Sequence, residues 1–343
     1  MSSSQAPRIA SFELGRVIAI LAIIGLHCQM ALTYWHIDQV PWIGYLLNQS
    51  ARFAVPLFFL ISGYLIQPKL EQDPWGTLTR YSKPLLKVWL AWSIISLLMP
   101  FNLGTVFEHG YLAEREGYWS FLMTAPLNSL LEGGLVHLWF IPALVFAVLI
   151  LASLIDMNLH RFILPVATAF YLYGVLAGSY INLTELEPPF FTRNGPFFST
   201  LMVALGFMVR QNQWLISSKR ALIILAIGMV LHFGEAFWLK DYDMAFNIHE
   251  FLFGTVFWAF GMFMLLLANP KVGNMKWVSL LSKHMLGIYV SHLLVIILMF
   301  NVMGMLEIEG IAKDVIVYVS VIILSVTLVA GLEKTPLKKW LLR

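Results

Sequence analysis

Apolar residues run through this chain in ten long segments that are separated by short polar stretches. Windows of about 19 residues, the length of helix that crosses a bilayer, predict one membrane-spanning helix for each segment. The pattern therefore predicts an all-α polytopic membrane protein with about ten transmembrane helices. The predicted spans cover residues 12–33, 48–67, 83–100, 135–155, 162–180, 196–210, 220–238, 249–268, 279–300 and 312–332.

Basic residues are distributed unevenly between the two sides of these predicted helices. With the N-terminus placed inside, sixteen of the 22 Lys and Arg residues lie inside, four lie outside, and Arg16 and Arg52 fall within spans. Cytoplasmic loops are the ones that are enriched in Lys and Arg. We therefore expect both termini in the cytoplasm. The longest outer loop, about residues 101–134, contains Y-W-S-F-L-M, which predicts either an interfacial helix or an ordinary loop with aromatic anchors.

Composition agrees with a membrane protein and excludes several other classes. The chain is 59% hydrophobic and 12% charged, with a mean hydropathy of +0.77, whereas soluble domains are roughly 25% charged. A single cysteine excludes an internal disulfide. The sequence shows no repeat, no low-complexity run and no feature of nucleic-acid binding, so residues 1–343 are expected to form one integral-membrane domain. The first apolar segment is expected to be a retained span, because no small-residue cleavage site follows it.

The first segment carries the most suggestive polar pair. Arg16 and His27 are separated by 11 residues, which on an α-helix leaves the two side chains roughly 20° apart on one face and about 16 Å apart along the axis. Arg16 would then lie at the cytoplasmic edge and His27 near the middle of the membrane. A histidine at that depth marks a functional site or is satisfied by a neighbouring helix, and the first interpretation is favoured.

Two further groups of basic residues allow alternative interpretations. Arg52 precedes a long apolar run, so it needs an anionic partner or a watery cavity unless it reaches the outer interface. In the same segment Ser62–Gly63 is typical of close helix contact. Arg80, Lys83 and Lys87 repeat at helical spacing and form a basic ridge. This ridge either anchors the helix on the cytoplasmic side or docks a polyanion such as the phosphates of a nucleotide-bearing cofactor, and anchoring is the simpler interpretation.

Other polar residues inside the predicted spans are candidates for a site. His137 and Trp139 open the fourth span at its outer end, Glu235 follows a histidine by three positions, and Tyr289 and His292 lie one helical turn apart in the ninth span. Nine histidines are present, but neither H-E-x-x-H nor another close spacing occurs, so no metal site is expected.

Four motifs in this order resemble the acyltransferase-3 family of membrane O-acyltransferases, and together they span nearly the whole chain. They are an acidic residue, an arginine and a histidine at Glu13, Arg16 and His27, then R-F-A-V-P-L-F-F-L-I-S-G-Y-L at Arg52–Leu65, H-L-W-F at His137–Phe140 and S-K-H-M-L-G-I-Y-V-S-H at Ser282–His292.

The resemblance implies transfer of an acyl group, usually acetyl, from cytoplasmic acetyl-CoA to a hydroxyl of a cell-surface glycan or lipid-linked saccharide, without a metal. His27 would be the base or would carry the acyl group covalently. Glu13 would pair with Arg16, and Arg52 would stabilise the oxyanion or orient His27. The other expected roles are nucleotide binding by Arg80, Lys83 and Lys87, donor-tunnel lining by Tyr289 and His292, and acceptor binding by His137, Trp139 and Glu235.

The resemblance also implies a multi-pass protein of the bacterial cytoplasmic (inner) membrane, in contact with lipid and compatible with a homo-oligomer.

The polar residues inside the spans, considered without the resemblance, also fit a second class of function. A bundle with buried His, Arg and Glu side chains is also typical of a proton-coupled transporter or flippase for a polysaccharide or lipid-linked sugar. The two functions differ in their need for acyl-CoA, which only the enzyme consumes.

Overall fold

The computed structural model describes residues 8–342, and within this range the secondary structure is helical apart from one isolated bridge between Ile37 and Val40. The apolar segments form helices because a helix satisfies its own backbone hydrogen bonds where no water is present. The helices are α1 (Ala10–His27), α2 (Trp42–Ser50), α3 (Ala54–Gln72), α4 (Pro74–Leu98), α5 (Leu103–His109), α6 (Tyr111–Met123), α7 (Pro126–Glu132), η1 (Val136–Trp139), α8 (Phe140–Asp156), η2 (His160–Phe162), α9 (Ile163–Leu176), α10 (Ile181–Thr184), α11 (Pro196–Gln211), α12 (Ser218–Trp238), η3 (Leu239–Tyr242), α13 (Phe253–Ala268), α14 (Lys276–Lys283), α15 (Met285–Met305), α16 (Gly310–Leu332) and α17 (Lys338–Leu341).

Each of the ten predicted segments overlaps a helix, but fewer helices are long and apolar enough to cross a membrane alone. Six helical stretches of the described chain meet that criterion, and a seventh does so if α4 and α5, bent by 44°, form one span. The helices α9 and α13 are apolar but shorter. The structure thus confirms an all-helical protein with several membrane-spanning helices, whereas ten spans and cytoplasmic termini stay predictions. The six stretches are Ala10–His27, Trp42–Gln72, Val136–Asp156, Ser218–Tyr242, Met285–Met305 and Gly310–Leu332.

The first span ends earlier than the sequence predicted, at His27 instead of residue 33. Beyond it the backbone turns, with positive φ angles at Gln29 and Ala31. A buried carboxylate of α16 fixes this turn: Asp314 Oδ2 accepts hydrogen bonds from the Ala31 N–H at 2.6 Å and the Tyr34 hydroxyl at 2.7 Å. His27 therefore occupies the final helical turn, next to a break in the chain.

Three other predicted ranges join parts that are separate in the structure. Arg52 lies in the turn between α2 and α3, not within one continuous helix. Residues 249–252 precede α13 in a non-helical conformation, and α14 is separated from α15 by His284. Hydropathy merges such pieces because their apolar content continues across the breaks.

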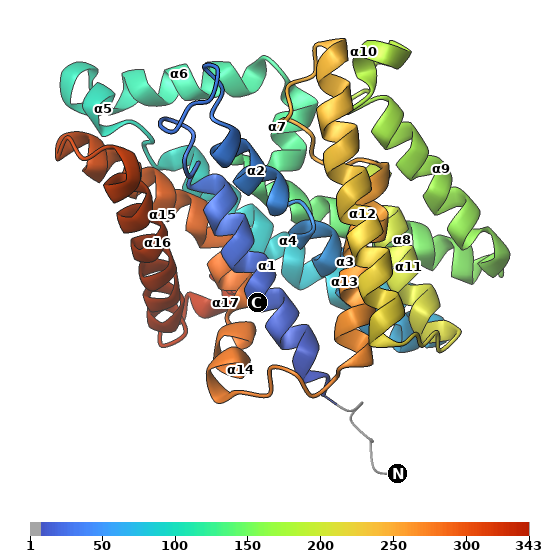
Figure 1. Ribbon diagram of the computed structural model, residues 1–343. Coiled ribbons are helices and arrows are strands. Elements are labelled where there is room, and N and C mark those ends of the chain that lie inside the picture. The colour runs from blue at the N-terminus through green and yellow to red at the C-terminus, as the bar shows by residue number, and fades with distance from the viewer. Residues whose placement is uncertain (1–7, 343) are drawn as a thin grey trace.

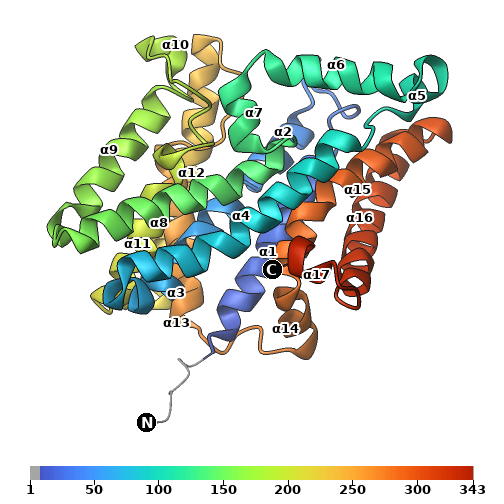
Figure 2. The same ribbon diagram turned by 180° about the vertical axis from the view of Figure 1, so that it is seen from behind.

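The helix α1 crosses the middle of the bundle, where it packs against α3, α13, α14, α15 and α16 (Figure 1). Seen from behind, α4 and α8 run side by side across the other face (Figure 2). In both views α5 and α6 lie at one end of the bundle and α14 at the opposite end. The central position of α1 places its Arg16 and His27 within reach of several other helices.

The outer-loop stretch Y-W-S-F-L-M, predicted as either an interfacial helix or an ordinary loop, lies in a helix, α6. This helix carries exposed Phe121 and Met123. A buried ion pair holds this helix to the end of α4. Arg115 donates from Nε to Glu114 at 2.5 Å and from Nη1 to the Ser96 carbonyl oxygen at 3.3 Å. The hydrogen bonds from Arg115 hold the pKa of the Glu114 carboxyl below its ordinary value. This pair therefore stabilises α6 at neutral pH, and its contribution disappears as acid protonates Glu114.

Glycines allow α3 and α11 to approach backbone to backbone, as the sequence predicted for Ser62–Gly63. A Cβ atom at Gly63 would lie 2.0 Å from the Val203 carbonyl oxygen, and one at Gly206 would lie 2.0 Å from the Leu60 carbonyl oxygen. Small residues stabilise helix pairs in membranes because they permit this close packing.

We expect Gly63→Ala to destabilise the protein by about 1–3 kcal/mol, because the added methyl group would force α3 and α11 apart. Thermal unfolding in detergent measures the effect. The matched control is Gly234→Ala in α12, where a Cβ would meet nothing within 4 Å. The control should leave stability unchanged or raise it by up to about 1 kcal/mol. Equal melting temperatures for both variants would contradict the close contact.

Candidate functional site

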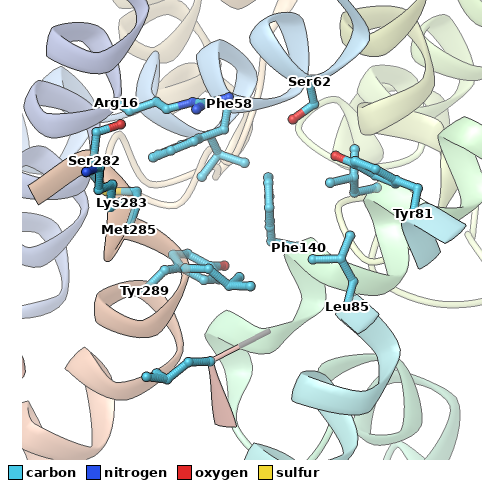
Figure 3. Close-up of a pocket in the computed structure, with 14 residues that line it drawn as sticks. Arg16, Phe58, Ser62, Tyr81, Leu85, Phe140, Ser282, Lys283, Met285 and Tyr289 are labelled. Atoms are coloured by element: carbon cyan, nitrogen blue, oxygen red, sulfur yellow. The ribbon is translucent and has the colours of Figure 1, made fainter. Parts of the chain in front are cut away.

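Arg16 lines a cavity of about 360 Å³ between the central helices, which we call the Arg16 cavity. Figure 3 shows Arg16, Tyr81 and Tyr289 arranged around it from α1, α4 and α15. Lys283, at the end of α14, supplies a second cationic side chain. The full lining is Arg16, Val55, Phe58, Ser62, Tyr81, Leu85, Phe140, Leu144, Ser282, Lys283, Met285, Leu286, Tyr289 and Leu342. Two cations above apolar walls suit a ligand with an anionic part and a slender apolar part.

A second cavity of about 100 Å³, the His27 cavity, adjoins the first. Val55 and Tyr289 line both cavities, so these two side chains form the boundary between them. The His27 cavity is lined by Ile23, Leu26, His27, Ala51, Arg52, Val55, Val136, His137, Trp139, Arg193, Phe198, Glu250 and Tyr289. Arg16 and His27 therefore line two adjacent cavities, in agreement with their expected placement on one face of the first helix.

Three histidines from three separate segments gather beside the His27 cavity. The ring centroids of His27 and His292 are 5.3 Å apart, and those of His137 and His292 are 5.0 Å apart. The sequence placed His137 near the acceptor and His292 in the donor tunnel, whereas the structure brings both next to His27. Among the described residues no group of three or more His, Cys, Asp or Glu side chains is arranged to hold a metal ion.

Backbone carbonyl groups determine the tautomers of two of these histidines. His137 Nε2 lies 3.0 Å from the Val290 carbonyl oxygen, and His292 Nδ1 lies 2.5 Å from the Tyr289 carbonyl oxygen. A carbonyl oxygen only accepts, so each of these nitrogens carries the proton. The opposite nitrogens, Nδ1 of His137 and Nε2 of His292, are buried without a protein partner. In the neutral rings both nitrogens are acceptors, and His137 belongs to the lining of the His27 cavity.

Tyr289 connects the two cavities by a hydrogen bond as well as by position. Its hydroxyl donates to the backbone carbonyl oxygen of His137. Its ring packs against Phe140 with a centroid distance of 5.3 Å, and Phe140 stacks on Phe59 at 4.7 Å. Trp139 and Phe198, 6.1 Å apart, complete the aromatic wall. The boundary is therefore held by packed aromatic rings.

An ionic bridge closes the other side of the His27 cavity. Arg52 Nη1 donates to Glu250 Oε2 at 2.6 Å, and Arg193 Nη1 donates to Glu250 Oε1 at 2.9 Å. Arg193 Nη2 also donates to Glu132 at 2.8 Å. The bridge gives Arg52 the anionic partner that the sequence required. It joins the α2–α3 turn, the segments preceding α11 and α13, and the end of α7.

A third cavity of about 620 Å³ lies beyond this bridge, and we call it the outer cavity. Arg193 and Glu250 line both it and the His27 cavity. The remaining lining comes mainly from the loops before α11 and α13: Asn128, Ala177, Gly178, Ser179, Ile181, Glu187, Pro188, Pro189, Phe190, Phe191, Thr192, Met244, Ile248, His249 and Phe251. Shared residues thus connect three cavities in a row through the protein.

The predicted basic ridge lies on α4 beside the Arg16 cavity, not in its lining. Tyr81 and Leu85, on the neighbouring face of α4, line the cavity. Arg80 pairs with Asp73 at 2.9 Å, Lys83 is exposed, and the Lys87 ammonium lies 3.9 Å from the centre of the Trp340 ring. Contact of this ridge with a nucleotide outside the cavity stays a prediction.

Glu13 and Glu235, the two acidic residues with predicted roles in the site, accept hydrogen bonds from other parts of the protein. Glu13 Oε1 accepts a hydrogen bond from Arg8 Nε at 2.7 Å. Glu235 accepts hydrogen bonds from the N–H groups of Phe253 and Gly254, at 2.9 and 2.7 Å, and so caps the start of α13. This capping accounts for Glu235 structurally, and its expected contact with an acceptor stays a prediction.

The sequence did not indicate Lys283 or Arg193 as site residues, and it placed Glu250, beside His249, only in a polar vestibule near the outer face. Lys283 was counted only among the inner basic residues, and Arg193 only among the outer ones. Arg193 and Glu250 stand 57 positions apart in segments without a distinctive motif. For Arg193 and Glu250 the only signal in the sequence was compositional, because each charge lies beside a long apolar run.

The chain is similar over part of its length to bacterial racemases. It is 29% identical over 257 residues to a serine/alanine racemase of Enterococcus gallinarum, which covers 69% of this chain and 34% of the relative. An amino-acid racemase of Enterococcus faecalis is 23% identical over 227 residues, 62% of this chain and 31% of the relative. The chain thus spans about a third of the length of these relatives. No solved structure matches it.

The family model described as an acyltransferase domain matches residues 9–332, which covers every helix of the three cavities except the C-terminal turn around Leu342. The motifs that resembled this family in the sequence provide Arg16, His27, Arg52, His137 and Tyr289 to the cavity walls. The chain therefore belongs to the acyltransferase-3 family of membrane acyltransferases.

Proposed function

We propose that this protein is an O-acyltransferase that transfers an acetyl group from acetyl-CoA to a hydroxyl of a cell-surface glycan or lipid-linked saccharide. The observation that carries the proposal is the shared boundary at Val55 and Tyr289. It joins a cavity with two cationic residues, suited to an anionic thioester donor, to a smaller cavity that contains His27.

The donor would enter the Arg16 cavity with its acyl end first. Arg16 and Lys283 offer positive charge to the phosphate-bearing part of acetyl-CoA, while Phe58, Leu85 and Phe140 form walls for its slender arm. The nucleotide end would stay outside, along the ridge of Arg80, Lys83 and Lys87. The thioester would then lie at Tyr289, next to a compartment of about 100 Å³, which favours a small acyl group such as acetyl.

His27 would act as the base. It takes the proton of the acceptor hydroxyl as that oxygen attacks the thioester carbon, and it returns the proton to the departing CoA thiolate. A C–O bond forms and the C–S bond breaks. The oxyanion of the tetrahedral intermediate needs donors, and Arg52, at the wall of the same cavity, is placed to supply one. A covalent acyl-His27 intermediate is the two-step version of this reaction.

The acceptor hydroxyl would meet the donor in the His27 cavity, whose walls include His137 and Trp139. The ring centroid of His292 lies 5.3 Å from that of His27, so His292 would help to hold the His27 ring in position. We place the basic end of the bundle, with α14, toward the cytoplasm of a bacterial cell, because Lys and Arg favour that side. The names of the racemases describe proteins of which this chain matches about a third, so they carry no assignment for this chain.

We expect His27→Ala to lower acetyl transfer by about 10²–10⁴-fold, the usual cost of losing a general base. Mass spectrometry of surface glycans from a deletion strain that expresses each variant measures the transfer as the gain of acetyl groups. The control is His160→Ala, which removes a surface histidine bonded to Glu71. Normal acetylation by His27→Ala protein at normal membrane levels would refute the proposal. Transport of a saccharide without any acyl-CoA would favour the carrier instead.

Removal of one cation from the Arg16 cavity should weaken donor binding without removing the base. We expect Lys283→Gln to raise the KM for acetyl-CoA by about 10–100-fold with a smaller change in kcat, because a charge-assisted hydrogen bond contributes about 1.5–3 kcal/mol. Steady-state kinetics in nanodiscs measure both constants. Lys276→Gln, at the exposed start of the same helix α14, is the matched control. The same KM for both variants would show that the donor binds elsewhere.

A further inference from the structure

The bridge between Arg193 and Glu250 is the boundary between the His27 cavity and the outer cavity. Both residues line both cavities. Any molecule that passes from the outer cavity to His27 must therefore pass these two side chains. Their pairing distance of 2.9 Å leaves no room for a hydroxyl group between them.

Among Arg52, Glu250 and Arg193, the Glu250 side chain is the most exposed. Its side chain is 36% exposed, whereas those of Arg52 and Arg193 are 9% and 15% exposed. Both arginines have further partners, because Arg52 also donates to Asn48 at 2.9 Å and Arg193 to Glu132 at 2.8 Å. Glu250 belongs to the non-helical segment before α13. If Glu250 were displaced, Arg52 would keep its hydrogen bond to Asn48 and Arg193 its hydrogen bond to Glu132.

Several buried polar atoms around the bridge lack a protein partner. They include Nε of Arg52, Nε of Arg193 and both ring nitrogens of His249, a side chain that is buried and lines the outer cavity. Buried polar groups in native proteins are usually satisfied, so such a cluster indicates a place for water or a ligand with hydroxyl groups. The cluster lies on the path from the outer cavity to His27.

The charges of the outer cavity indicate what kind of molecule can enter. The one arginine in its lining is already paired with Glu132 and Glu250, and Glu187 adds a further negative charge. While Glu250 holds the passage closed, an anionic group that enters the outer cavity would meet net negative charge. An uncharged hydroxyl-bearing ring would pack against Phe190 and Phe191 and bond to polar groups such as His249.

We propose that the outer cavity receives an uncharged, hydroxyl-bearing acceptor and that Glu250 is the gate between this cavity and His27. This inference rests on the proposed acyl transfer. The acceptor hydroxyl takes the place of the Glu250 carboxylate at the two arginines and so reaches His27. Without an acceptor, Glu250 keeps the passage closed and excludes water, which would otherwise form acetate and free CoA by attack of its oxygen on the thioester carbon.

The test measures hydrolysis of acetyl-CoA by the full-length protein in nanodiscs without any acceptor, from the rate of free thiol release. Glu250→Gln removes the charge that binds both arginines, and we expect hydrolysis to rise about tenfold, the change that matches a loss of roughly 1.4 kcal/mol in closure. Arg193→Lys should also raise it, because lysine keeps the charge but cannot bond Glu132 and Glu250 together. Glu71→Gln, at a surface pair with His160, is the matched control.

The double variant His27→Ala and Glu250→Gln shows whether the hydrolysis takes place at the proposed site, and its rate should fall back to background. Hydrolysis at the wild-type rate in folded Glu250→Gln and Arg193→Lys proteins would overturn the gate, while loss of transfer in His27→Ala would still support the proposed function. Persistent fast hydrolysis in the double variant would also overturn it.

A third measurement follows access to the His27 cavity instead of hydrolysis. Ala51, buried in the His27 cavity, is replaced by cysteine in a Cys28→Ala background. With the gate closed, a membrane-impermeant thiol reagent should label this cysteine slowly, and addition of Glu250→Gln should accelerate labelling about tenfold. Rapid labelling with Glu250 in place would contradict the closed passage.

Discussion

The Glu250 carboxylate between Arg52 and Arg193 is the interaction on which the arrangement of the site depends. It joins the α2–α3 turn to the segments preceding α13 and α11, and through Glu132 it reaches α7. These segments are far apart in the sequence, and hydrophobic packing alone does not select their register. A charged group inside an apolar bundle is costly without a partner, so each of these residues restricts where the others can lie.

The same requirement explains the histidine cluster. His137 and His292 each donate to a backbone carbonyl group, and Tyr289 donates to the carbonyl group of His137. These bonds fix the ring orientations and leave one acceptor nitrogen on each ring without a protein partner. The aromatic packing of Phe140 against Tyr289 and Phe59 then keeps the boundary between donor and acceptor compartments narrow. In the proposed reaction this boundary between the Arg16 cavity and the His27 cavity would allow a small acyl group to pass while the bulk of each substrate stays on its own side.

Local sequence patterns predicted the helices and the central pair well. Apolar runs gave helices because a helix satisfies its backbone within the chain, and the 11-residue spacing placed Arg16 and His27 beside adjoining cavities. Helix ends were predicted less well, because Asp314, nearly 300 positions away, fixes the turn after His27. Arg193 was missed, and Glu250 was assigned only to a vestibule near the outer face, for the same reason: the role of each depends on a contact between distant loops. Glu235 shows the converse, a polar residue in an apolar segment whose partners are the N–H groups of a helix terminus.

In the proposed reaction the thioester of the donor lies at the boundary of Val55 and Tyr289, within reach of His27. A cryo-electron microscopy structure of the protein with a non-hydrolysable acetyl-CoA analogue would locate it. We expect density for the slender arm of the analogue in the Arg16 cavity between Arg16, Lys283 and Phe140, with its acyl end at Tyr289 facing His27. An analogue bound on another surface, with the Arg16 cavity empty, would contradict it.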